Sequence, residues 1–134
     1  MTFKIKSISE LAEVAAEILQ NLKFKIILFE GELGAGKTTL IKELLKQMNS
    51  SDQVSSPTFS IINAYDIPGK KVYHFDFYRI KSEEEALDFG TEEYLDSGEY
   101  CFIEWPDIIR NLLPAEFHTL KIQVEDGQRI LNFV

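Results

Sequence analysis

The chain has 134 residues, 45% of them hydrophobic, which is enough apolar side chain for the core of one domain and too little for two. Its formal net charge of −8 disfavours direct, non-specific binding to nucleic acid, because nucleic-acid phosphates repel an acidic surface. An acidic protein can still serve an RNA pathway through a protein partner that holds the RNA.

The expected compartment follows from what the sequence lacks. The single cysteine, Cys101, cannot form an internal disulfide, which is typical of the reducing cytosol. Residues 1–6 lack the apolar stretch of a secretory signal, and no apolar run approaches the roughly 18 residues that span a bilayer. We therefore expect a cytoplasmic protein with no membrane partner.

The first predicted elements are short. Residues 3–5 fit an edge strand, and Ser9 is expected to cap an amphipathic helix that ends near Asn21. The apolar run 25–30 is typical of a buried parallel strand. Residues 39–48 then carry apolar side chains at helical spacing, which predicts a second helix.

The segment between that strand and that helix organises the chain. Residues 31–38, Gly-Glu-Leu-Gly-Ala-Gly-Lys-Thr, fit the phosphate-loop pattern G-x-x-x-x-G-K-[ST] at every fixed position. Glycines let the backbone approach a polyphosphate, successive N–H groups point into one concavity, and the helix N-terminus adds positive charge. Lys37 is expected to reach the β- and γ-phosphates, and the Thr38 hydroxyl to ligate Mg²⁺.

The second half of the chain is predicted to begin with a β-hairpin. Residues 59–65 and 72–78 fit strands around a turn at 66–70, after an extended segment at Pro57. The later predicted elements are a capping-box helix from Ser82 to Phe89, a helical turn at 91–95, a strand at 100–104, a brief helix at 107–112, and strands 119–124 and 129–134 around Asp126-Gly127. We expect one α/β domain over residues 1–134, P-loop NTPase-like, with a mixed, mostly parallel sheet, flanking helices and β-hairpins.

A phosphate loop needs an acid near its Mg²⁺, commonly at the end of an apolar strand beside the loop. Glu104 ends the run 101–103, and we predict a role for it in holding the metal or a metal-bound water. Asp76 lies near the end of the strand 72–78, where it is expected to organise the metal shell or the attacking water. The alternatives are a surface acid for Glu104 and a structural ion pair, for instance with Arg79, for Asp76.

Thr58 lies in a Ser-Pro-Thr segment after the nucleotide helix, where nucleotide switch segments often lie. Its hydroxyl is predicted to sense the γ-phosphate or the metal, with a simple strand-start threonine as the alternative. Among other residues, His74 is expected to be a packed strand histidine, and Cys101 an inert core residue. Trp105 fits either core packing or an aromatic exposed beside the site for a partner.

Three function classes fit a phosphate loop. A GTPase is disfavoured because Asp66–Gly69, although of the form D-x-x-G, falls in the hairpin turn, and no N-K-x-D pattern is present. A small-molecule P-loop kinase needs an acceptor pocket and usually an arginine-bearing lid. Of the three arginines only Arg79 is expected near the loop, and no segment is long enough for a lid. A nucleotide-gated assembly factor that hydrolyses ATP slowly and acts on a protein partner fits best, with the kinase as the alternative.

Four blocks together resemble the TsaE family, also called YjeE. They are the loop 31–39, Ser56-Pro57-Thr58-Phe59, the segment Tyr-His-Phe-Asp-Phe-Tyr-Arg at 73–79, and Ile103-Glu104-Trp105-Pro106. The phosphate loop alone is unspecific, whereas the four blocks in this order and spacing are highly specific and cover nearly the whole chain.

The resemblance implies a bacterial, Mg²⁺-dependent ATPase of tRNA threonylcarbamoyladenosine biosynthesis. The modification lies on adenosine 37 of tRNAs that read codons beginning with A. The family protein does not transfer the group itself. It binds the complex of the transferase TsaD with TsaB and supports the multiple turnover of that complex. The family protein therefore interacts with tRNA only indirectly, through the complex.

Site roles carry over from the family by position. Phosphates and nucleotide are expected at Ile8, Leu33, Gly34, Ala35, Gly36, Lys37, Thr38 and Thr39, with the metal at Thr38 and Glu104. Lys37, Asp76, Glu104 and Thr58 would be the catalytic set. The chain departs from the family at Glu32, where Asp is common, and at Leu11 and Ala15, where the first helix often carries Thr and Gly.

Overall fold

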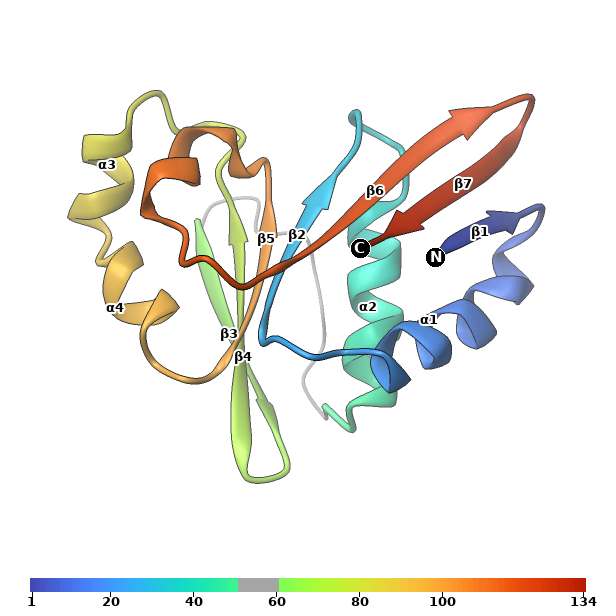
Figure 1. The fold of residues 1–134 in the computed structure, drawn as a ribbon, viewed down its shortest axis with the longest axis horizontal. Coiled ribbons are helices and arrows are strands. Elements are labelled where there is room, and N and C mark those ends of the chain that lie inside the picture. The colour runs from blue at the N-terminus through green and yellow to red at the C-terminus, as the bar shows by residue number, and fades with distance from the viewer. Residues whose placement is uncertain (51–60) are drawn as a thin grey trace.

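The structure is a computed structural model that describes residues 1–50 and 61–134. Seven described strands form one sheet in the order β1-β7-β6-β2-β5-β4-β3 (Figure 1). The strands are β1 (Thr2–Ile5), β2 (Ile26–Glu30), β3 (Ile62–Ile67), β4 (Lys70–Asp76), β5 (Tyr100–Glu104), β6 (His118–Glu125) and β7 (Gln128–Phe133). The helices are α1 (Leu11–Gln20), α2 (Lys37–Gln47), α3 (Glu83–Asp88) and α4 (Thr91–Leu95), with 3-10 helices η1 (Ile8–Glu10) and η2 (Pro106–Leu112).

The strand directions confirm a mixed, mostly parallel sheet. The four neighbouring strands β6, β2, β5 and β4 pair in parallel. β7 pairs antiparallel with both β6 and β1, and β3 pairs antiparallel with β4. Only β7 and β3 therefore run against the other described strands, and the two predicted hairpins, β3–β4 and β6–β7, are both confirmed.

Helices cover both faces of the sheet, so that the core has two parts (Figure 1). On one face, α1 and α2 pack against Ile27 and Phe29 of β2 and Phe102 of β5. On the other face, α3, α4 and η2 lie over Leu28 of β2 and Ile103 of β5. Burial on both faces explains why β2 is an uninterrupted apolar run, as parallel central strands commonly are.

Parallel pairing brings the carboxyl ends of β2, β5 and β4 to one edge of the sheet. In the register, Glu104 lies opposite both Phe29 of β2 and Asp76 of β4. The β3–β4 turn, with the D-x-x-G sequence 66–69, lies at the other edge, because it precedes the amino end of β4 (Figure 1). That sequence is therefore far from the phosphate loop, which agrees with the disfavoured GTPase assignment.

Three local expectations were wrong in detail. Ser9 does not cap α1: it lies within η1, and its hydroxyl contacts that of Ser7 at 2.8 Å. The β3–β4 turn is tighter than 66–70, because Ile67 already pairs with Lys70. The helix expected at 107–112 is a 3-10 helix that begins one residue earlier, at Pro106. The remaining elements predicted within residues 1–50 and 61–134 are present. They include the helix capped by Ser82, whose hydroxyl accepts the Glu85 N–H.

His118 has a structural role that its sequence context did not indicate. Its Nε2 accepts the backbone N–H groups of Lys23 and Phe24, at 2.9 and 3.1 Å. Its other nitrogen, Nδ1, therefore carries the proton and donates to the carbonyl of Val134 at 3.1 Å. The ring joins the segment before β2 to the end of the chain and has both nitrogens partnered.

None of the helices in the described part of the chain is long and apolar enough to cross a bilayer.

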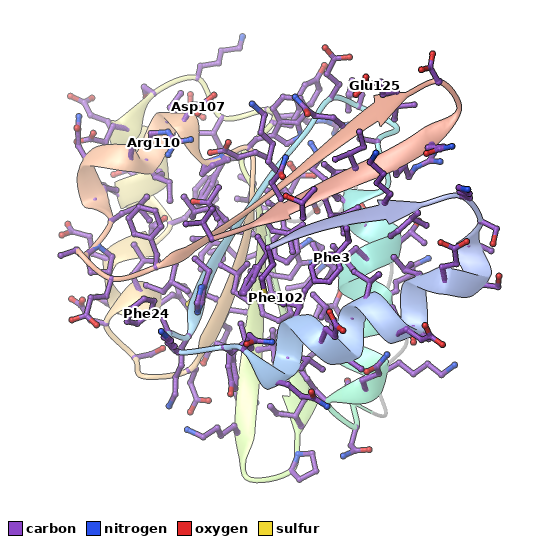
Figure 2. All side chains as sticks on the ribbon, turned by 45° about the vertical axis from the view of Figure 1, so that its right-hand side comes forward. Phe3, Phe24, Phe102, Asp107, Arg110 and Glu125 are labelled. Carbon is purple, nitrogen blue, oxygen red and sulfur yellow. The ribbon has the colours of Figure 1, made fainter. Side chains whose placement is uncertain are left out.

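Replacing Phe102 by Ala should lower the free energy of unfolding by about 3–5 kcal/mol, because the cavity left in a close-packed core cannot fully collapse. Phe102 is fully buried and contacts Phe29 edge-on, and Figure 2 shows its ring inside the molecule. Urea unfolding followed by circular dichroism measures the change. The exposed Val124→Ala on β6 is the control and should change stability by less than about 0.5 kcal/mol. Equal unfolding midpoints for the two variants would contradict this description of the core.

Candidate functional site

The phosphate-loop segment leads from β2 directly into α2, whose first residue is Lys37. Two of its glycines are required by the space around them. A Cβ on Gly31 would lie 2.8 Å from the carbonyl oxygen of Ile122, so only glycine lets the loop pass so close to β6. Gly36 has φ of +107° and precedes the helix in a left-handed conformation that side chains disfavour. The loop shape therefore depends on both the pattern glycines and the neighbouring strand.

Arg129, at the start of β7, holds the loop from outside. Its Nε donates to the carbonyl of Ala35 at 2.8 Å, and its side chain lies across Gly36, whose Cβ would be 3.3 Å from Nε. The expectation that only Arg79 lies near the loop was therefore wrong. The reason is the β6–β7 hairpin, which folds a residue 94 positions away back onto the loop.

A second arginine also lies beside the loop. Arg110 of η2 forms an ion pair with Glu30, the last residue of β2 before the loop, and a second with Asp107 at 3.1 Å. Figure 2 shows Arg110 and Asp107 together on this segment. The pairing fixes η2 against the end of β2, so the segment that follows Glu104 is attached to the segment that precedes the loop.

The Lys37 side chain is buried and already has partners inside the protein. Its Nζ donates to the carbonyl of Gly31 at 2.5 Å and lies 3.7 Å from the centre of the Trp105 ring, a cation–π contact. Burial lowers the pKa of Lys37, and the carboxylates of Glu104 and Asp76 oppose that shift. Trp105 therefore packs beside the site, against Lys37 and against Tyr78, whose ring centre is 4.9 Å from its own.

The two predicted acids lie next to each other at the carboxyl edge of the sheet. Asp76 is half-buried, and Glu104 is only 3% exposed. Burial raises the pKa of Asp76, while the N–H of Tyr78, which donates to its Oδ1 at 3.0 Å, acts against that shift. One oxygen of Glu104 is 2.6 Å from Nε2 of His74, a contact between two buried side chains. His74 is packed, as predicted, but its carboxylate partner was not foreseen.

A cavity of about 470 Å³ joins these groups, a size that suits a nucleotide-like ligand. The phosphate loop and the acids line one end, and residues before and within α1 line the other. The lining residues are Ile5, Lys6, Ser7, Ile8, Leu11, Leu33, Gly34, Gly36, Lys37, Thr38, Thr39, Asp76, Glu104, Trp105 and Arg129.

The structure therefore brings nearly all sequence-predicted site residues into one cavity. Ala35 is the exception: it does not line this cavity, its side chain is buried in the core, and its N–H donates to the carbonyl of Glu32 at 3.1 Å. Thr58 lies outside the described residues. Ile8, which the resemblance placed in the nucleotide site, lines the cavity and is 75% exposed.

Sequence reasoning missed several lining residues. Lys6, Ser7 and Leu11 surround Ile8, so a wider window around that position would have included them. Arg129 carries no local signal, since nothing in its neighbourhood marks a residue that reaches the phosphate loop. It pairs with Ile5 across β7 and β1, which places it beside the same wall.

The side chains around the cavity offer oxygen donors for a metal ion. Among residues 1–50 and 61–134, no group of three or more His, Cys, Asp and Glu side chains is arranged to hold a metal. Thr38, Asp76 and Glu104, whose side chains carry a hydroxyl and two carboxylates, nevertheless line one cavity. This set fits Mg²⁺, which takes oxygen ligands and usually binds through one or two protein groups, waters and phosphates.

A glycine loop between a central parallel strand and a helix, with acids at the same sheet edge, defines the class: an α/β protein with a P-loop NTPase-like fold. A family model described as "Threonylcarbamoyl adenosine biosynthesis protein TsaE" matches residues 5–131. The chain belongs to the TsaE family, as its sequence motifs predicted.

Individual relatives support the same family assignment. The chain is similar to a protein named tRNA threonylcarbamoyladenosine biosynthesis protein TsaE from Rickettsia typhi, with 37% identity over 95% of this chain and 89% of the relative. A protein of the same name from Bacillus subtilis is 37% identical over 81% of this chain and 68% of the relative. The crystal structure of Bacillus subtilis YdiB is similar in fold, with a TM-score of 0.78 and 27% identity over 99% of this chain and 83% of that chain.

Replacing Asp76 by Asn should stabilise the protein at neutral pH. Because burial raises the pKa of Asp76, the folded state binds the proton more tightly than the unfolded state, and wild-type stability falls as pH rises from the ordinary value through the raised one. The variant escapes this loss, and Asn can still accept the Tyr78 N–H. Urea unfolding at about pH 7 and about pH 3.5 should show a gain that is present only at the higher pH. An equal effect at both would contradict the burial of the charge.

Proposed function

We propose that this chain is an accessory ATPase that binds and hydrolyses ATP with Mg²⁺ and supports formation of threonylcarbamoyladenosine at adenosine 37 of tRNAs reading codons that begin with A. One observation carries the proposal: Lys37, Asp76 and Glu104 line the same cavity as the phosphate loop. Membership of the TsaE family supports the pathway. The protein would act in the cytoplasm and would not transfer the threonylcarbamoyl group itself.

In this proposal the nucleotide lies along the cavity. Backbone N–H groups of the loop and the start of α2 hold the phosphates, with Lys37 neutralising their charge. The base and sugar lie against the wall of Ile5, Ser7, Ile8 and Leu11, where apolar side chains can pack on a flat ring. Arg129 keeps the loop in place by its bond to Ala35. Thr58, as a sensor of the γ-phosphate, belongs to the proposal through the family resemblance alone.

Thr38 and Glu104 would hold Mg²⁺, with Asp76 organising the metal shell and the attacking water. The bound ion supplies charge neutralisation at the phosphoryl oxygens. Asp76, half-buried at the cavity beside Glu104, is placed to accept a hydrogen bond from such a water. Glu104, buried and already bonded to His74, is better suited to a fixed ligand position than to moving protons.

Hydrolysis by the protein alone is expected to be weak. Lys37 is engaged by Gly31 and Trp105 in this conformation, so it has to leave those partners before it can reach a phosphate. A protein partner that moves Trp105, or supplies further groups to the open cavity, would therefore complete the site. We propose the TsaB–TsaD complex as that partner, with ATP turnover linked to its repeated cycling.

Contact with tRNA would be indirect. The net charge of −8 works against binding to a phosphate backbone, and the complex would present the tRNA instead.

The test combines two assays on the purified chain with TsaB and TsaD. ATP hydrolysis should rise when the complex is added, and tRNA modification beyond one turnover should require this chain. A chain that ignores the complex and phosphorylates a small molecule would instead establish the kinase alternative.

Lys37→Ala should reduce ATP affinity by at least about tenfold and abolish multiple-turnover modification, because the phosphate charge loses its main partner. Calorimetric titration with ATP and Mg²⁺ measures the affinity. Lys46→Ala, an exposed lysine in the last turn of α2, is the matched control and should bind ATP normally. Native affinity in the Lys37 variant would rule out the phosphate-loop assignment.

Glu104→Ala should lose Mg²⁺-dependent hydrolysis by about 100-fold or more while retaining measurable nucleotide binding, since the loop contacts remain. Hydrolysis is measured as phosphate release with the TsaB–TsaD complex present, and binding as before. The exposed Glu125→Ala at the end of β6 serves as control. Unchanged turnover in the Glu104 variant would remove this residue from the metal role.

A further inference from the structure

His74 lies on β4, two residues before Asp76, and its side chain is on the same sheet face as α2. Alternation along the strand places Val72, His74 and Asp76 on that face, and Val72 belongs to the α1–α2 core. On the neighbouring β5, Phe102 and Glu104 share the face. The register pairs His74 with Phe102 and Asp76 with Glu104, so His74 stands diagonally below the acid at the end of β5.

The contact between the two side chains is short and sheltered. Nε2 of His74 and Oε2 of Glu104 are 2.6 Å apart, with His74 fully buried and Glu104 3% exposed. An ionised carboxylate only accepts hydrogen bonds, so Nε2 is the donor. Away from bulk water such a charge-assisted bond is strong and directional, and it limits rotation of the carboxylate about its last bond.

Within the part of the chain that the structure describes, the other ring nitrogen of His74 has no hydrogen-bond partner. Nδ1 is buried, and no hydrogen bond reaches it from the described residues. The nearby Tyr65 ring lies 6.3 Å away, centre to centre, and contributes packing. An unpaired buried nitrogen lowers stability, so packing alone does not account for a histidine here. The contrast is His118, also buried, which has both nitrogens bonded.

We propose that His74 is a positioning residue for the metal site: its Nε2–H holds one oxygen of Glu104 and leaves the other directed to the cavity. The inference rests on the proposed function, in which Glu104 holds Mg²⁺. Groups that bond to a metal ligand commonly fix its orientation, and here the cost of an orphaned Nδ1 is offset by a carboxylate that is already in place before the ion binds. His74 touches neither nucleotide nor metal in this scheme.

The first test examines the hydrogen bond in the free protein. The chain has two histidines, so long-range nitrogen–proton NMR spectra of the imidazoles are simple to assign. The structure assigns opposite tautomers: the proton on Nε2 of His74 and on Nδ1 of His118. A His74 ring protonated on Nδ1 alone would overturn the proposal without any reference to nucleotide.

The second test compares His74→Leu with His74→Gln, whose amide can still donate from a position close to Nε2. Nucleotide binding is measured first in EDTA and then at increasing Mg²⁺, and the Mg²⁺ half-effect is the concentration at which half of the Mg²⁺-dependent gain in affinity is reached. Removal of a ligand-orienting group usually weakens metal binding, so this concentration should rise by about tenfold or more in the Leu variant. In the Gln variant it should rise by less than about threefold. Binding in EDTA should match the native protein in both.

A purely structural role is separated by His118→Gln, which removes a buried histidine away from the cavity. This variant should lower the melting temperature and leave the Mg²⁺ half-effect unchanged. A Mg²⁺ half-effect that rises in all three variants in proportion to their loss of stability would overturn the positioning role.

The two levels of the proposal can fail separately. If the native protein binds nucleotide with Mg²⁺ dependence and the Leu variant keeps the native half-effect, the role of His74 falls while the ATPase proposal stands. If the native protein binds no nucleotide, the proposed function falls and this inference falls with it.

Discussion

Parallel pairing of β2, β5 and β4 is the constraint on which the site depends. It brings the start of the phosphate loop, Glu104 and Asp76 to one edge of the sheet, and the sheet register fixes the acids opposite each other. No acid could serve a metal at the loop if either strand slipped by one residue, because its side chain would then point to the other face. The apolar runs of β2 and β5, buried on both sides by helices, hold that register.

Burial of the side chains that form the site also makes their charged forms less favourable. Burial lowers the pKa of Lys37 and raises that of Asp76, which disfavours the charged form of each, and the attraction between Lys37 and the two nearby carboxylates offsets part of this effect. In the proposed function, a polyphosphate and a divalent cation supply further opposite charges. Lys37 also donates to the carbonyl of Gly31 and lies against the Trp105 ring, so its ammonium group has partners within the protein.

Support for the site comes from beyond the loop itself. Arg129 from β7 bonds the carbonyl of Ala35, and Arg110 from η2 pairs with Glu30, so the loop is held at its middle and at its beginning by distant segments. The pairing of β1 with β7 also places the wall around Ile5 beside Arg129. One hairpin, β6–β7, thus links the proposed base end of the cavity to its proposed phosphate end. At the acids, His74 supports Glu104 by the contact between its Nε2 and the carboxylate.

The sequence by itself determined the phosphate loop, the order and approximate limits of the strands and helices, the acids at strand ends and the family, because each depends on residue type at short, fixed spacing. Local reasoning misplaced the cap of α1, since the 3-10 turn before it depends on how the chain leaves β1. Only the tertiary structure decided the partners of side chains distant in sequence. Arg129 at the loop, Lys37 against Trp105, and His74 bonded to Glu104 are contacts between segments that strand order brings together. Periodicity reveals which face of a strand is buried, but not which polar group on the next strand will meet it there.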